Sequence, residues 1–157
     1  SLSMSEIFLL AENIEKQGLE FYTGAAAAAQ NPKVKDVMKF LAEEETRHAG
    51  IFADLRQKFF GSDDMYVNHD DEEAAKYITG LVDTHVFNVS KDVAELLGSI
   101  QTPKSALEMA INFEKDTIAC FTGFKKLAKG EVKLIDRLIQ EEFSHIEKLE
   151  KVLKEIA

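Results

Sequence analysis

The chain has 157 residues, 45% of them hydrophobic and 30% charged, and its formal net charge is −9 at pH 7. This length and composition suit one globular domain with one hydrophobic core, so we predict a single domain over residues 1–157, with residues 1–3 left over from the expression vector. The acidic balance excludes nucleic acid and anionic membranes as the main partners, because neither is attracted to a negatively charged surface.

Four long amphipathic helices are predicted in chain order, over residues 5–30, 33–59, 103–129 and 131–156. Pro32 separates the first two, because the residue before a proline resists the helical conformation. Thr102 is expected to cap the third helix, with Pro103 at its first position. Gly61 and Gly130 follow long periodic segments and are predicted to stop the second and third helices.

The stretch between the second and third helices is predicted to be a partly helical crossover. Residues 60–73 are acidic and rich in turn formers, which indicates a loop. Residues 72–87 have a helical pattern, and residues 90–98 are predicted to form a short helix capped by Ser90. A connection of this length can return to the far end of a bundle, so the second and third long helices can run parallel. The predicted fold class is therefore an all-α four-helix bundle.

The two pairs of long helices repeat one another in sequence. EKQGLEFYTG (15–24) aligns with EKDTIACFTG (114–123), and EETRH (44–48) aligns with EEFSH (141–145), in the same order along the chain. Two similar helical hairpins are therefore expected to pack about a pseudo-twofold axis. Gly24 and Gly123, which end the first match, either allow another helix to approach closely or are simply tolerated.

A Glu-x-x-His pattern in the second and fourth helices lies in line with residues predicted to form the core. Glu45 and His48 share a seam with leucine and phenylalanine at spacings of three and four, and Glu142 and His145 do the same in the fourth helix. One such pattern alone is common on helix surfaces, where it forms an intrahelical pair. Two copies in register on core seams favour a metal site.

The first and third helices each add a glutamate to the same seams, Glu15 and Glu114. Four unpaired carboxylates are strongly disfavoured in an apolar interior, whereas two divalent cations would balance their four negative charges. Carboxylate oxygens with one imidazole per metal suit iron or manganese, and zinc is an alternative. The sequence thus predicts a two-metal centre inside the bundle.

The remaining acidic, imidazole and thiol side chains are interpreted as ordinary parts of the fold. The glutamates off the seams are predicted to be helix surface: Glu12, Glu20, Glu43, Glu44 and Glu141. His69 and His85 fall in the crossover and are predicted to be solvated or paired locally. The single cysteine, Cys120, is assigned no role and fits a reducing cytoplasm. No apolar run reaches the roughly 18 residues of a membrane span, and the N-terminus does not resemble a secretory signal.

With its two Glu-x-x-His patterns and two seam glutamates, the chain resembles the ferritin-like di-iron carboxylate superfamily. Within that superfamily it resembles the rubrerythrin-like proteins that consist of the bundle alone. The family signature is a glutamate on helix one, Glu-x-x-His on helix two, a glutamate on helix three and Glu-x-x-His on helix four. The chain matches it at Glu15, Glu45, His48, Glu114, Glu142 and His145. The resemblance implies that these six residues form the catalytic centre and bind two iron ions, with Glu45 and Glu142 as bridges and the others as terminal ligands.

The resemblance also implies neighbours for this centre. Tyr22 matches an aromatic position that can hydrogen-bond a ligand carboxylate, and its repeat counterpart Phe121 cannot. Rubrerythrins carry a further carboxylate three residues after the helix-three glutamate, where this chain has Thr117. Their C-terminal rubredoxin domain, with four cysteines, has no counterpart in this sequence. A separate electron donor such as a rubredoxin-like protein is therefore expected, and the family implies a homodimer.

The function that the resemblance implies is that of a cytoplasmic oxidoreductase that reduces peroxide or oxygen and so counters oxidative stress. Two other functions stay open. The first is iron handling with ferroxidase activity, as in ferritins, in which iron accumulates without turnover by a reductant. The second is a metal-free or zinc-filled bundle that serves as an interaction module, which the metal content of the isolated protein would reveal.

Overall fold

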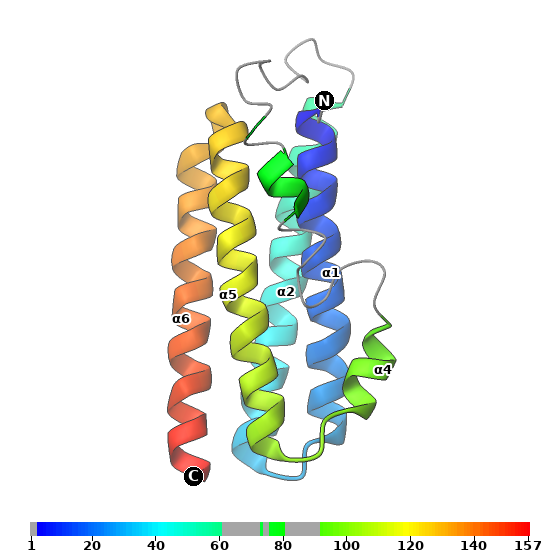
Figure 1. Ribbon diagram of the computed structural model, residues 1–157, viewed down its shortest axis with the longest axis vertical. Coiled ribbons are helices and arrows are strands. Elements are labelled where there is room, and N and C mark those ends of the chain that lie inside the picture. The colour runs from blue at the N-terminus through cyan, green and yellow to red at the C-terminus, as the bar shows by residue number, and fades with distance from the viewer. Residues whose placement is uncertain (1–2, 61–72, 74–75, 81–91) are drawn as a thin grey trace.

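The computed structural model describes residues 3–60, 73, 76–80 and 92–157 (Figure 1). Its four long helices are α1 (Met4–Ala28), α2 (Pro32–Phe59), α5 (Pro103–Leu127) and α6 (Val132–Ile156). Each begins and ends within two residues of its predicted bounds. The all-α four-helix bundle is therefore confirmed.

Side-chain caps define the start of three of the long helices. In α1, Ser3 Oγ accepts a hydrogen bond from the Glu6 backbone N–H at 3.1 Å, and Glu6 Oε2 accepts one from Ser3 N–H at 2.9 Å. Asn31 Oδ1 caps α2, and Thr102 Oγ1 caps α5 by accepting from Ser105 N–H at 3.0 Å. Such caps satisfy backbone donors that have no partner within the helix. Ser3 thus contributes to the fold, although the sequence analysis had set it aside.

The end of α5 differs from the prediction in position and in cause. The helix ends at Leu127, because Ala128 leaves the helical region with φ −95° and ψ 62°. Gly130 was predicted to stop the helix, but it lies inside the following short 3₁₀ helix η3 (Lys129–Glu131). The reversal between α5 and α6 is therefore made by Ala128 and this 3₁₀ turn.

The described part of the crossover contains two helical pieces. Residues 76–80 are helical, and α4 (Val93–Gly98) occupies the predicted short helix. The cap of α4 is Asp92, whose Oδ1 accepts from Ala94 N–H at 2.9 Å, so the prediction of Ser90 as the cap was wrong. The predicted acidic loop, apart from its two ends, and the predicted stop at Gly61 lie outside the described residues.

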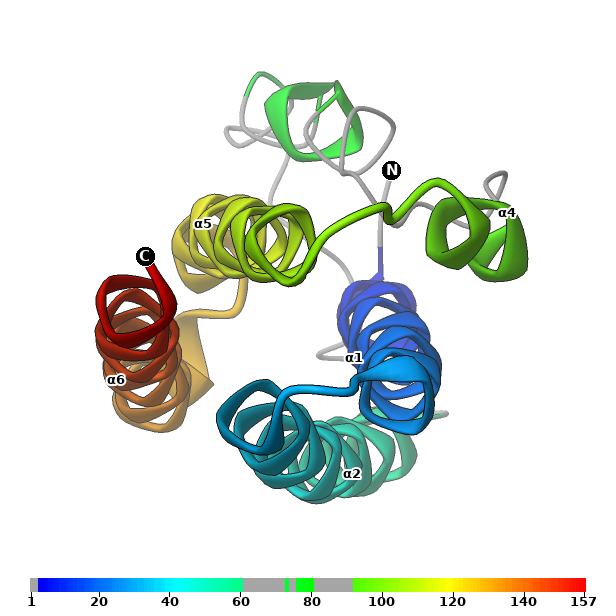
Figure 2. The same cartoon turned by 90° about the horizontal axis from the view of Figure 1, so that it is seen from below.

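The long helices form two hairpins, α1 with α2 and α5 with α6. In Figure 1, α1 and α6 run downward while α2 and α5 run upward, so the second and third long helices are parallel as predicted. Figure 2, viewed along the bundle, places α2 diagonally opposite α5, with α1 and α6 at the other corners. Contacts are dense within each hairpin and sparse along the α1–α5 and α2–α6 seams. The bundle is thus two tight pairs joined along two looser seams.

Two glycines at matching places in the repeat receive the crossover. A Cβ on Gly24 of α1 would lie 2.3 Å from Leu97 Cδ1, and a Cβ on Gly123 of α5 would lie 1.8 Å from Ile78 Cδ1. Real Cβ atoms do not approach that closely, so the absence of a side chain is used at both positions. Of the two interpretations offered for these glycines, close approach is the correct one, and the approaching segment is the crossover.

Glu12 of α1 was predicted to be helix surface, and this prediction was wrong. Its side chain is 4% exposed and pairs with Lys16 Nζ and Arg56 Nε, each at 2.8 Å. Burial by itself would raise the pKa of Glu12, but the two cations outweigh it and lower that pKa. Arg56 lies 44 residues away on α2, so this ion pair ties the two helices of the first hairpin together.

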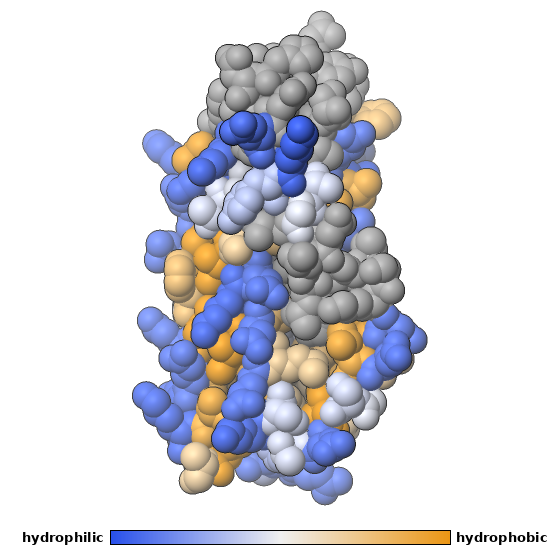
Figure 3. All heavy atoms as spheres, viewed as in Figure 1, coloured by the Kyte–Doolittle hydropathy of each residue, from blue (hydrophilic) through white to orange (hydrophobic). Residues whose placement is uncertain are grey.

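The outer faces of the helices are strongly polar. On the face drawn in Figure 3, hydrophilic residues form bands along the helices, with hydrophobic residues between the bands. Within the described ranges, none of the helices combines the length and the apolar character needed to cross a membrane.

Candidate metal centre

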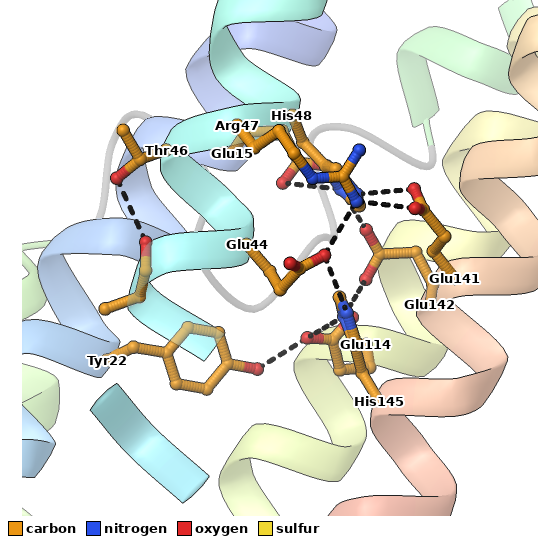
Figure 4. Close-up of polar contacts among 11 residues, drawn as sticks. Glu15, Tyr22, Glu44, Thr46, Arg47, His48, Glu114, Glu141, Glu142 and His145 are labelled. Carbon is orange, nitrogen blue, oxygen red and sulfur yellow. Dashed lines mark hydrogen bonds and ion pairs between the residues drawn. The ribbon is translucent and has the colours of Figure 1, made fainter. Parts of the chain in front are cut away.

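The six predicted ligands come together inside the bundle, and Figure 4 shows five of them, Glu15, His48, Glu114, Glu142 and His145. α1 provides Glu15 and α5 provides Glu114, while α2 and α6 provide the two Glu-x-x-His pairs. All six residues are buried, with residue exposures between 0 and 2%. The helical period explains the placement, because the residues that flank them at three and four positions are core residues such as Leu41 and Phe52. The seam assignment made from the sequence is therefore reproduced for every one of the six.

Glu142 lies between the two histidines. Its Oε1 is 2.8 Å from His48 Nδ1, and its Oε2 is 3.3 Å from His145 Nδ1. Each histidine also faces the glutamate of its own hairpin: His48 Nδ1 is 3.6 Å from Glu15 Oε2, and His145 Nδ1 is 3.7 Å from Glu114 Oε1. The two imidazole rings stack with their centroids 5.8 Å apart. The site therefore has two similar halves that share one carboxylate.

Most polar atoms of the six side chains have no hydrogen-bond partner. Nine such atoms are buried: both carboxylate oxygens of Glu15, Glu45 and Glu142, Oε2 of Glu114, and Nδ1 of His48 and His145. The short contacts to Glu142 do not meet at hydrogen-bonding angles. Burying polar atoms without a partner costs free energy, so these nine atoms need a partner that accepts their electron pairs. Metal cations do so.

The atoms divide into two groups that could each hold a cation. One contains Glu15, His48 and Glu142, and the other contains Glu45, Glu114, Glu142 and His145, with the ligand atoms of each group within 4.8 Å of one another. Glu142 belongs to both groups, which fits a bridging carboxylate. Three or four carboxylate and imidazole donors per cation suit iron or manganese. The residues present therefore fit a di-metal centre.

Burial and charge shift the protonation of this cluster. Burial, followed by the charge of Glu142, raises the pKa of Glu15 to about 7. Burial would lower the pKa of His48, but the carboxylates of Glu142 and Glu15 outweigh it and raise that pKa to about 11. Burial would raise the pKa of Glu142, and the two histidines beside it lower it instead. At neutral pH His48 therefore carries a proton, and its positive charge faces the carboxylates of Glu142 and Glu15.

Tyr22 makes the predicted contact with a ligand carboxylate. Its hydroxyl donates to Glu114 Oε1 at 2.7 Å. Burial and the charges of Glu142 and Glu15 raise the pKa of Tyr22, so the phenol stays protonated and remains a donor. The repeat counterpart Phe121 has no hydroxyl and stacks edge-on against Phe52, at 5.1 Å between centroids. The two halves of the site therefore differ in how the terminal glutamate is held.

A layer of charged residues between α2 and α6 covers the two histidines. Glu141 Oε2 lies 2.9 Å from His48 Nε2, and Glu44 Oε2 lies 3.6 Å from His145 Nε2. Arg47 Nη2 donates to both carboxylates, to Glu44 at 2.7 Å and to Glu141 at 2.5 Å. Each carboxylate thus contacts the histidine of the other helix, at the outer nitrogen. Glu141 lies within hydrogen-bond distance of His48 Nε2, so it keeps a proton on that nitrogen and leaves Nδ1 to face Glu142 and Glu15.

This layer was not predicted, because Glu44 and Glu141 were expected on the helix surface. Both are only partly exposed, and both touch a buried histidine. A signal was present in the sequence, since each bridging-type glutamate is preceded by a second glutamate at equivalent places in the repeat.

Other predictions about titratable residues stand as follows. Glu20 and Glu43 are exposed, as predicted. Cys120 is buried in the core, where burial, and then the charge of Asp116, raise the pKa of its thiol to about 12. His69 and His85 lie outside the described residues.

Gly18 of α1 packs against Phe113 and Glu45, so a substitution there tests how tightly the residues around the candidate metal centre are packed. A Cβ there would lie 2.6 Å from Phe113 Cζ and 3.2 Å from the carboxyl carbon of Glu45, whereas a Cβ on Gly50 would meet nothing within 4 Å. Gly18→Ala should therefore destabilise the protein by about 1–3 kcal/mol through overpacking. Gly50→Ala should stabilise it by about 0.5–1 kcal/mol, because alanine favours a helix. Denaturant unfolding of both variants decides, and equal stability of Gly18→Ala and the wild type would contradict this geometry.

Comparisons with known proteins agree with this arrangement. The model of the rubrerythrin family matches residues 6–95, which include nearly all of α1, all of α2 and the candidate ligands Glu15, Glu45 and His48. A crystal structure of a protein from Thermotoga maritima, described as ferritin-like and of the diiron-carboxylate kind, superimposes with a TM-score of 0.73. That match covers 99% of this chain and 97% of the other at 23% identity, so it shows a shared fold. None of the curated proteins matches the sequence.

Proposed function

Because the chain belongs to the rubrerythrin family, we propose that it is a di-iron carboxylate oxidoreductase that reduces peroxide or oxygen with electrons from a separate donor. The observation that carries the proposal is the set of nine buried, unpartnered ligand atoms on six side chains at the centre of the bundle. When bound, a ferrous pair supplies two electrons, one from each iron, which is the number that reduction of peroxide to two water molecules requires.

The six side chains take distinct roles in holding the pair. Glu142 lies beside both histidines and belongs to both ligand groups, so it would bridge the two metals. Glu45 belongs to one of the groups, and its proposed role as the second bridge rests on the resemblance to the family. Glu15 and Glu114 are terminal carboxylates. The two histidines provide one nitrogen to each half of the site. Four carboxylates and two neutral imidazoles balance the four positive charges of two ferrous ions.

Neighbouring residues orient these ligands and keep bulk water away. The Tyr22 hydroxyl holds its proton against Glu114 Oε1 and fixes that carboxylate, because the raised pKa keeps the phenol from losing the proton. The buried rings of Phe52 and Phe121 lie to one side of the ligand layer along the bundle. Such a dry, rigid setting preserves ligand geometry while the metal charge changes.

One observation favours the alternative, an iron-handling ferroxidase without peroxidase turnover. The position three residues after Glu114 is Thr117, which is fully buried and carries no carboxylate. The extra carboxylate of the rubrerythrins is therefore missing here. This absence of a seventh acidic ligand weakens the case for efficient peroxide reduction and leaves iron oxidation as the second candidate.

We expect the protein, loaded anaerobically with ferrous iron, to bind two irons per chain and to oxidise faster with hydrogen peroxide than with oxygen. Stopped-flow absorbance in the near ultraviolet measures both rates, and elemental analysis measures the iron. Half an equivalent or less would overturn the di-metal centre. A faster reaction with oxygen, followed by accumulation of more than two irons per chain, would support the ferroxidase. Sustained peroxide consumption with a reductant would support the oxidoreductase.

The proposal extends to partners and setting. A rubredoxin-like protein is proposed as the electron donor, a homodimer as the assembly, and the cytoplasm as the location. Gel filtration with light scattering tests the dimer. Reduction of the oxidised protein by a rubredoxin and its reductase tests the donor.

A further inference from the structure

We propose that divalent cations reach the metal centre through the seam between α2 and α6, where Glu44 and Glu141 receive them and Arg47 is a plug that must swing aside. The inference rests on the proposed di-metal function, and it assigns a role to the charged layer over the two histidines. The chemical class of the ligand is a hydrated divalent cation.

On this side of the bundle, the charged layer of Glu44, Arg47 and Glu141 lies between solvent and the two histidines. The side chains of Arg47, Glu44 and Glu141 are 44%, 21% and 29% exposed. Directly behind them, the histidine side chains are 0% and 3% exposed. One set of side chains therefore separates water from the metal-binding atoms on this side, and the layer touches both the surface and the site (Figure 4).

The opposite seam is closed by aromatic rings. Between α1 and α5, Tyr22 and Phe113 are fully buried and meet edge to face at 6.0 Å. A hydrated cation passing there would lose its water among apolar groups without gaining a carboxylate, which is costly. The remaining two boundaries of the bundle lie within the hairpins, where the helices contact each other densely. Among the described residues, the α2–α6 seam presents two partly exposed carboxylates, Glu44 and Glu141, that also contact the histidines of the site.

Arg47 occupies a place that suits a cation. Its Nη2 contacts both carboxylates and lies 3.4 Å from His48 Nε2. The ligand atoms of Glu44, His48 and Glu141 also lie within 4.8 Å of one another, close enough to hold one metal ion. The guanidinium and a metal ion cannot occupy this position together. With Arg47 in place, the arginine and the two glutamates sum to −1, and once Arg47 swings aside the two glutamates present −2 to an arriving divalent cation.

The repeat makes Arg47 a single plug. The two glutamates occupy equivalent positions in EETRH and EEFSH, whereas the counterpart of Arg47 is Ser144. Only one side chain must therefore move to free both carboxylates. Rotamer changes of exposed side chains take picoseconds to nanoseconds and need no helix movement. The structure thus combines a buried site with rapid access.

The test is the kinetics of Co²⁺ uptake and release in the full chain. Uptake is followed by stopped-flow absorbance, and release by transfer to excess EDTA. Arg47→Gln should speed both uptake and release about fivefold, since two partly exposed ion pairs no longer need to open. Two cobalt ions should still bind per chain, with nearly unchanged affinity. Arg47→Lys should lie between Arg47→Gln and the wild type, and Glu141→Gln should slow uptake.

The matched control is Arg56→Gln, which removes an arginine that pairs with Glu12 away from this layer. Its uptake rate should equal that of the wild type. Uptake by Arg47→Gln within twofold of the wild type, or a change in affinity without a change in both rates, would overturn the plug. A wild type that binds no Co²⁺ and no ferrous iron would instead overturn the proposed function, so the two failures are distinguishable.

Discussion

Loading with ferrous iron is expected to raise the melting temperature of the protein by about 10–20 °C. The reason is linkage: the folded bundle offers two assembled sites and the unfolded chain offers none. At free metal about a hundredfold above the dissociation constant, each site adds about 2.7 kcal/mol, or about 5 kcal/mol together. For a chain of 157 residues, each kcal/mol corresponds to roughly 2–4 °C. Anaerobic calorimetry with and without iron measures the difference.

Glu142→Gln should abolish most of this gain. The substitution keeps the shape of the side chain but removes the negative charge that both ligand groups share. The matched control is Glu147→Gln, five residues along the same helix at an exposed position. It should keep the full shift. If Glu142→Gln binds two irons and gains as much stability as the control, Glu142 is not a bridge.

Metal affinity is expected to rise steeply with pH. The metal-free protein holds a proton on His48, whose pKa is raised to about 11, and this proton must leave before Nδ1 can bind a metal. Affinity should therefore increase about tenfold per pH unit above pH 7. Below pH 7 the slope should approach twice that value, because Glu15 is then protonated as well. Competitive Co²⁺ titrations between about pH 6 and 8.5 measure both slopes.

The stability of the metal-free fold should show the opposite dependence. The pKa of His48 is raised above the ordinary value of 6.5, so its contribution is full below that pH and is lost as pH rises toward 11. Glu15 acts in the same direction between 4.5 and about 7. Denaturant unfolding in chelator should thus show stability falling from pH 7 to pH 9. An affinity independent of pH, or metal-free stability that rises over this range, would contradict the proton on His48.

The buried positions of the six candidate ligands could be predicted from the sequence, because they are a property of single helices. Glu45 and His48 lie in line with Leu41 and Phe52, and that alignment follows from the helical period alone. The residue types then indicated a metal site, since buried carboxylates need positively charged partners. Helix bounds were equally accessible, because Thr102 and the prolines mark them locally.

The incorrect predictions concern contacts between helices, and the sequence of one helix does not specify those contacts. Glu12 is buried because Arg56 arrives from α2, and Glu141 is covered because Arg47 crosses from α2 to α6. On a helical wheel both glutamates lie off the core seam. Their neighbours are set by the distance and rotation between helices, and these are tertiary quantities. Gly130 is a similar case, since the conformation of Ala128 ends α5 before the glycine is reached.

The division of the bundle into two tight hairpins has a consequence for how the protein opens. Each hairpin carries half of the proposed ligands, so neither would bind a metal pair alone, and bound metals would join segments nearly a hundred residues apart. Without metal, separation along the two looser seams should form a partially unfolded state in which each hairpin keeps its backbone hydrogen bonds. With metal, that state should become rarer, as it does when a cross-link closes a long loop. Native-state hydrogen exchange would then change from two cooperative units to one.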